Sequence, residues 1–158
     1  MLFRSFIKKD VVFNPNGILC GARSVTVFGK YAYICCDAGI VIVDIEDHKN
    51  LKVVNVLKEG EHVHHAHNVE FQFRYGFICD EEGVKVIDVT DPTKPQFISE
   101  VELDDVHNIY VARTYGYVSA GHHGLVILDL KNPKQPKIDQ IYNAGGCIND
   151  LQIGRAHV

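Results

Sequence analysis

The chain has 158 residues, of which 46% are hydrophobic and 23% are charged. This composition is typical of a globular domain and excludes an intrinsically disordered chain. The formal net charge of −4 disfavours general nucleic-acid binding, which needs a basic face. No apolar run approaches the roughly 18–20 residues that cross a bilayer, so we expect no membrane span.

In chain order, residues 1–17 are the first expected element. Within them, residues 6–13 have the pattern of an outer strand that belongs to a preceding repeat unit. The apolar patch near Met1 is short and is not followed by a small-residue cleavage site, so it does not qualify as a signal peptide. We therefore expect residues 1–17 to be such an outer strand or a linker.

The next unit, residues 18–60, contains four short segments rich in β-branched and aromatic residues, which favour strands. The third segment begins with a glycine and ends with an aspartate, and it is apolar in between, which is expected of a strand covered on both faces. The four predicted strands are Val25–Val27, Tyr31–Cys35, Gly39–Asp44 and Leu51–Leu57.

Two further units, residues 61–103 and 104–146, repeat this pattern. The aspartates that end the third strands are Asp44, Asp88 and Asp129, at intervals of 44 and 41 residues. The loops that follow them contain Asp-Pro or Asn-Pro in the second and third units, which is turn chemistry. Four short strands in a period of roughly 40–45 residues are typical of a propeller blade.

The sequence therefore predicts an all-β fold with almost no helix, a partial β-propeller of three four-stranded antiparallel blades and the start of a fourth. The start of the fourth unit falls in residues 147–158, beginning with Asn149 and Asp150. Residues 153–158 match the in-frame translation of a common sequencing adapter, so we expect a non-native tail there. Three blades cannot close a ring of four to eight, so we expect the chain to be a fragment.

The glycine-led strand, together with the Tyr-Ala/Gly-aromatic segment before it, resembles the LVIVD repeat. The motif is present as Gly39–Asp44, Gly83–Asp88 and Gly124–Asp129. The resemblance extends over residues 21–152 and implies a β-propeller in an exported or surface-associated bacterial or archaeal protein. It is closer still to large uncharacterised bacterial proteins, some of which carry multihaem modules. No Cys-x-x-Cys-His motif occurs here, so no haem role is transferred to any residue.

A histidine cluster is the densest candidate for chemistry. It has the sequence His62-Val-His64-His65-Ala-His67, in the connection between the first two blades. In an extended chain His65 and His67 lie on one face and His62 and His64 on the other. Neutral imidazole is a ligand for Zn, Cu, Fe or Ni. One interpretation is a metal site with ligands His64, His65, His67 and His107; the other is a polar loop with exposed histidines.

A second candidate comes from equivalent positions just before and at the first strand of each unit. Because these strands are the innermost of a propeller, their residues are expected to form a ring at the channel mouth. The ring would either bind a ligand or tie adjacent blades together through side-chain hydrogen bonds. The residues at these positions are Arg23, Ser24, His67, Asn68, His107, Asn108, Asn149 and Asp150.

Other polar and thiol groups have structural explanations. Cys35 and Cys36 alternate in direction along a strand, so a disulfide between them is not expected, and most of the five cysteines are expected to be buried. His122 and His123 occupy a turn whose counterparts are not histidine, which indicates a solvated turn. Asp44 and its equivalents are expected to stabilise turns. No nucleophile, phosphate-binding or calcium-loop motif occurs, so we predict no catalytic residues.

We predict a non-catalytic β-propeller module of a larger exported or surface protein that acts in binding or scaffolding. Its expected partners are the other blades of the full-length chain and a protein or glycan. Two alternatives remain open: an accessory module of a metal- or haem-containing redox protein, and a fragment of a metal-dependent propeller enzyme. The cofactor is either a metal ion or none. The resemblance alone implies an extracytoplasmic location.

Overall fold

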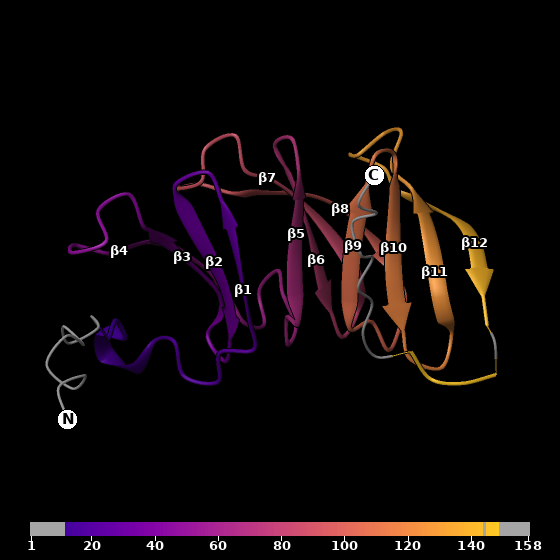
Figure 1. Ribbon diagram of the computed structural model, residues 1–158, viewed down its shortest axis with the longest axis horizontal. Helices are drawn as coiled ribbons and strands as arrows, with labels where there is room; N and C mark the ends of the chain where they lie inside the picture. Colours follow the sequence, from indigo (N-terminus) through magenta and orange to yellow (C-terminus); the bar gives the residue numbers. More distant parts are fainter. Residues whose placement is uncertain (1–11, 144, 149–158) are drawn as a thin grey trace, which may run out of the picture.

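A computed structural model describes residues 12–143 and 145–148 of the chain and contains three four-stranded antiparallel sheets (Figure 1). The first sheet comprises β1 (Ser24–Phe28), β2 (Tyr31–Cys36), β3 (Gly39–Asp44) and β4 (Lys52–Lys58). The second comprises β5 (Asn68–Gln72), β6 (Tyr75–Asp80), β7 (Gly83–Asp88) and β8 (Gln96–Glu102). The third comprises β9 (Asn108–Ala112), β10 (Tyr115–Ala120), β11 (Gly124–Asp129) and β12 (Lys137–Tyr142).

The three sheets are copies of one design, because strands pair in chain order and in the same register. The tyrosine that begins the second strand pairs with the aspartate that ends the third, as in Tyr31 with Asp44. Each sheet also has one register shift between its third and fourth strands, beginning at Ile42, Val86 and Ile127. The predicted all-β fold with four-stranded antiparallel units is confirmed, and its strand ends agree to within one or two residues.

The sheets follow one another along the molecule, and their first strands β1, β5 and β9 pack side by side (Figure 1). Two apolar cores fill the seams between sheets. In the first seam, the Tyr33 ring lies 4.4 Å from that of Phe71, and Phe28 stacks on Phe71 at 4.7 Å. In the second seam, Phe77 occupies the position of Tyr33, and Val111 occupies the position of Phe71. Burial of both faces explains why β3 and β7 are apolar almost throughout.

A glycine begins the third strand of every sheet for a steric reason. Gly39 and Gly83 have positive φ angles of 107° and 146°. A Cβ at either position would collide with a backbone carbonyl of the fourth strand, that of Leu57 or of Val101. Only glycine combines a positive φ with the absence of a Cβ, so the backbone geometry requires glycine at the first residue of the third strand.

The second sheet carries a buried ion pair that its sister sheets lack. Lys85 Nζ lies 2.8 Å from Asp80 Oδ2, and the two side chains are 4% and 0% exposed. Asp80 also accepts hydrogen bonds from the backbone N–H groups of His64, Glu82 and Gly83. These contacts compensate the desolvation of both charges. The equivalent positions are occupied by Cys36 and Val41 in the first sheet and by Ala120 and Val126 in the third.

The segment before β1 covers part of the outer face of the first sheet. Phe13, Ile18 and Leu19 pack near Cys36 and Val43. This segment includes a short 3₁₀ helix, η1 (Pro15–Gly17). The predicted outer strand in residues 6–13 lies almost entirely outside the described residues, and Val12 and Phe13 are not in a strand. No helix in the described part of the chain is long and apolar enough to span a membrane.

Beyond β12, residues 145–148 return toward the third sheet, where Ile148 N donates to the Gly121 carbonyl at 3.0 Å. This bridge is consistent with the start of another unit. The predicted first residues of that unit, Asn149 and Asp150, and the predicted tail of residues 153–158 lie outside the described residues.

Candidate functional site

Loops gather at the two ends of the strands and form two rims. The repeated rim contains the turns between the first two strands and the loops between the last two, residues 29–30, 45–51, 73–74, 89–95, 113–114 and 130–136. The variable rim contains the connections between sheets and the turns between the second and third strands, residues 18–23, 37–38, 59–67, 81–82, 103–107 and 121–123.

The repeated rim has the same chemistry in each unit. Asp44, Asp88 and Asp129 each accept a hydrogen bond from the backbone N–H group two residues later, at 2.8–2.9 Å. The predicted turn-stabilising role of these aspartates is therefore confirmed. A small hollow recurs beside each of them, lined by equivalent residues in all three sheets. These hollows are a property of the repeat and do not distinguish one unit from another.

On the variable rim, Arg23 ties the first sheet to the connection that follows it. Its guanidinium donates to the carbonyls of Ala66 and Cys36 at 3.2 Å and pairs with Asp37 at 2.7 Å. It also lies 3.5 Å from His65 Nδ1. These contacts are of the kind expected if the residues of the predicted ring link adjacent blades through side-chain hydrogen bonds.

Three of the predicted histidines lie side by side. The ring centroids of His65 and His67 are 5.4 Å apart, and those of His67 and His107 are 5.7 Å apart. Burial, followed by the neighbouring imidazoles of His65 and His107 and the nearby Arg23, lowers the pKa of His67, while Glu81 opposes this change. His67 is thus disfavoured as a cation, and the neutral imidazole is the form that binds metals.

At the next position of the predicted ring, residues of two sheets contact each other: the side-chain amide of Asn68 donates to Asn108 Oδ1. In the first sheet, Ser24 occupies the same slot, and its buried hydroxyl lies beside the Cys35 thiol and not between sheets. Asn149 and Asp150, the last two predicted members of the ring, lie outside the described residues.

His64 is separated from the other predicted metal ligands. Its backbone N–H donates to Asp80, and its ring Nε2 lies 3.6 Å from Glu82. The alternation predicted for an extended chain does not apply here, because the segment turns at residues 61–62 and bends at 64–65, where His65 has a positive φ of 54°. Within the described residues, no group of three or more His, Cys, Asp or Glu side chains is arranged to hold a metal ion.

A carboxylate–histidine network on the third unit was missed by sequence reasoning. Asp105 lies 3.0 Å from His107 Nε2 and 2.5 Å from His122 Nδ1, and it accepts a hydrogen bond from the His122 backbone N–H at 2.9 Å. These bonds, those from His122 first, lower the pKa of Asp105 to about 2. His123 similarly pairs with Asp104 at 2.7 Å. The turn predicted to be merely solvated is therefore linked to the connection before β9.

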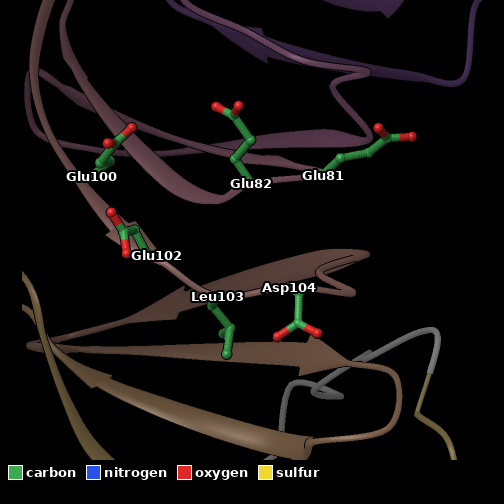
Figure 2. Close-up of a pocket in the computed structure, with 6 residues that line it drawn as sticks. All are labelled: Glu81, Glu82, Glu100, Glu102, Leu103 and Asp104. Carbon is green, nitrogen blue, oxygen red and sulfur yellow. The ribbon is translucent and has the colours of Figure 1, made fainter.

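An acidic hollow of about 480 Å³ lies beside this network (Figure 2). Glu100 and Glu102 belong to β8, and Glu81 and Glu82 belong to the turn between β6 and β7. Glu82 shares Lys85 with Asp80 and lies 2.6 Å from its Nζ. Glu100, Glu102 and Glu81 form no salt bridge with any described residue. The hollow is lined by Glu81, Glu82, Glu100, Glu102, Leu103 and Asp104. Its chemistry suits a cationic ligand.

The family profile described as the LVIVD repeat matches three stretches, residues 21–54, 65–102 and 105–144. These stretches cover more than half of the chain, and each contains one four-stranded sheet nearly whole. No curated protein matches the sequence.

Proposed function

Because the chain belongs to the LVIVD-repeat family, we propose that it is a non-catalytic β-propeller module that binds or scaffolds a partner through its variable rim. The contrast between the two rims supports this proposal. The repeated rim uses the same aspartate turn in each unit, whereas the variable rim presents different groups in each: Arg23 with Asp37, the imidazoles of His65 and His67, and Asp105 with His122. The side chains that differ between copies of one fold are the ones expected to select a partner.

We propose a protein segment rich in lysine or arginine as the partner. The acidic hollow on this rim contains three carboxylates that have no salt bridge in the described residues, Glu81, Glu100 and Glu102. An opposite charge on a partner would compensate them, steer its approach and set specificity. The hollow is open and contains a single apolar side chain, Leu103, so it suits a flexible basic side chain better than an apolar molecule.

This proposal is tested with a fluorescent oligolysine peptide and the full chain, using fluorescence anisotropy. The double variant Glu100→Gln/Glu102→Gln should weaken binding on the order of tenfold, equivalent to about 1.4 kcal/mol. A matched control, Glu46→Gln/Asp47→Asn, removes the same two charges from the repeated rim and should leave the affinity within about twofold. Equal losses in both variants would mean that only net charge matters and would refute a specific site.

We further propose that the full-length protein acts outside the cytoplasm, in the periplasm or at the cell surface. This location is what the family resemblance implies. Fractionation of cells that produce the full-length protein, followed by detection with an antibody against this module, checks it. Recovery in the cytoplasmic fraction alone, beside correctly separated marker proteins, would refute it.

The second candidate is an accessory module of a metal- or haem-containing redox protein. The adjacency of His65, His67 and His107 supports it, since imidazole is a ligand for Zn and Cu, and metal binding would require these described side chains to turn toward one ion. Titration with Zn²⁺ or Cu²⁺ by calorimetry should then give stoichiometric binding that His65→Ala/His67→Ala abolishes. The control His122→Ala/His123→Ala should retain it. The absence of binding in the parent chain would exclude this candidate.

A further inference from the structure

The middle sheet ends in an outer strand whose far edge is open. Its strands pair in the order β5 to β8, so β8 pairs with β7 alone among the described strands. At the inner end of the same sheet, β5 packs between β1 and β9. The sheet therefore has neighbours on both faces, and the open edge of β8 belongs to the unit itself. Such an edge presents backbone N–H and C=O groups with which a further strand can pair.

The backbone groups of β8 point alternately to β7 and to the open edge. Directly after β8, the Leu103 N–H donates to the Glu82 carbonyl at 3.1 Å, and the pairing from there to the register shift is regular. In an antiparallel ladder, residues that bond to the partner strand alternate with residues whose backbone groups face away. Val101 therefore pairs with β7, whereas Glu100 and Glu102 turn their N–H and C=O groups to the open edge.

The same two residues place their side chains in the acidic hollow. Glu100 is opposite Lys85 and Glu102 is opposite Gly83, so the two carboxylates lie on one face of the sheet, two residues apart. Both side chains are exposed and line the hollow (Figure 2). A strand added to this edge would present its own side chains at the same two-residue spacing, with Cβ atoms about 4.5–5.5 Å from those of the glutamates.

The outer strands of the sister sheets have a different charge. The slot of Glu100 is occupied by Val56 in β4 and by Ile141 in β12. Lys58 of β4 is in the slot of Glu102, and lysine on an edge strand is a common protection against pairing with another chain. Of the three described outer strands, β8 alone has carboxylates at these slots, so its edge is complementary to a basic strand.

We propose that the basic segment of the partner binds as an added antiparallel strand on β8, with lysine or arginine at every second position opposite Glu100 and Glu102. This inference rests on the proposed basic partner of the variable rim and adds the way in which it is recognised. In an antiparallel pair, the residue opposite Glu100 exchanges both backbone bonds with it and also faces its carboxylate. The backbone bonds supply affinity, and the two carboxylates select the charge and its spacing.

Two fluorescent peptides of the same composition test the spacing by anisotropy with the full chain. The alternating peptide is Thr-Lys-Thr-Lys-Thr-Lys-Thr-Lys, and the paired peptide, Thr-Lys-Lys-Thr-Thr-Lys-Lys-Thr, has no two lysines two residues apart. The alternating peptide should bind about fivefold more tightly, because two of its lysines meet both glutamates. Equal affinities that are both lost in Glu100→Gln/Glu102→Gln would overturn the added strand and leave the basic partner. Binding of neither peptide would refute both proposals.

Methylation of the peptide backbone tests the added strand without a change in charge. N-methyl groups on the two middle lysines of the alternating peptide remove N–H groups that face β8 and should weaken binding by at least about tenfold. N-methyl groups on the two middle threonines replace N–H groups that face away from β8 and should keep the affinity within about twofold. Equal losses from the two methylated peptides would overturn the proposal.

Amide hydrogen exchange in the chain itself gives a second readout, followed by NMR with and without the alternating peptide. The backbone N–H groups of Glu100 and Glu102 should exchange more slowly in the complex, because the added strand accepts their hydrogen bonds. The N–H of Val101 is the internal control, since it already pairs with β7 and its exchange should not change. Unchanged exchange at both glutamates in the peptide-saturated chain would overturn the proposal.

Discussion

Phe73 has a backbone conformation that suits glycine better than an aromatic residue. Its φ angle is 54°, and its side chain is 81% exposed. Gly29 occupies the same turn position in the first unit with a φ of 60°. We predict that Phe73→Gly raises the free energy of unfolding by roughly 0.5–1 kcal/mol, because relief of the left-handed strain outweighs the entropy cost of glycine. Chemical denaturation measures it, and Thr114→Gly, at a position without positive φ, should lower stability instead.

Gly83, in contrast to Phe73, is a glycine that a larger residue cannot replace without strain. A methyl group there would meet the Val101 carbonyl oxygen, and φ is 146°. We expect Gly83→Ala to lower the unfolding free energy by more than about 2 kcal/mol, since strain and steric overlap add. Gly60→Ala is the control: its φ is 78°, but no atom lies near the added methyl, so it should cost only about 1 kcal/mol. Thermal unfolding of the two variants side by side distinguishes the two contributions.

At the scale of the strand, the ion pair between β6 and β7 is the most vulnerable contact of the second sheet. Lys85→Val restores the residue type found in the sister sheets but leaves Asp80 buried and charged beside no cation. We predict a loss of about 3 kcal/mol in denaturant unfolding. Lys58→Val removes a lysine whose side chain is 69% exposed and should change stability by less than about 0.5 kcal/mol. A loss of similar size in both would contradict this account.

The loops that follow the third strands should respond to acid. The Thr90 hydroxyl and backbone N–H both donate to Asp88, and these bonds, the hydroxyl first, lower the pKa of Asp88 below its ordinary value. Stability from this contact is present above the unfolded pKa near 3.8 and is lost as the pH falls through the lower folded pKa. The unfolding free energy of the parent chain should therefore fall more steeply below pH 4 than that of Asp88→Asn.

The strands were predictable because their signals are local. A tyrosine with an aromatic residue two positions later and a glycine-led apolar run recur in each unit and define the second and third strands of each sheet. The buried pair also had a signal, since Asp80 and Lys85 stand where both sister sheets have small or apolar residues. The contact of Asp105 with His122 had no signal in the sequence, and neither had the acidic hollow. Both join residues from separate segments and depend on how the loops fold at the variable rim.

At the scale of the whole molecule, packing should protect three of the five thiols: the seams between sheets cover Cys35 and Cys79, and the segment before β1 covers Cys36. Cys35, Cys36 and Cys79 are buried, and burial raises the pKa of Cys35 to about 11. Cys20 and Cys147 are exposed. Because the thiolate is the reactive form, we predict that a maleimide labels two cysteines in the native chain and five in denaturant, counted by mass spectrometry. Labelling of Cys35 or Cys79 without denaturant would show that a seam opens, and labelling of Cys36 would show that the segment before β1 detaches.

The difference between the rims has a consequence for engineering this scaffold. Loops held by the same aspartate turn in every copy tolerate little change, because each one terminates a strand pair. The connections on the variable rim differ in sequence, and yet each one leads into the first strand of a sheet at the equivalent residue. A foreign peptide grafted between Gly60 and Glu61 would be displayed on the variable rim, outside the strands, provided that the turn which Gly60 N closes on the Val63 carbonyl is kept.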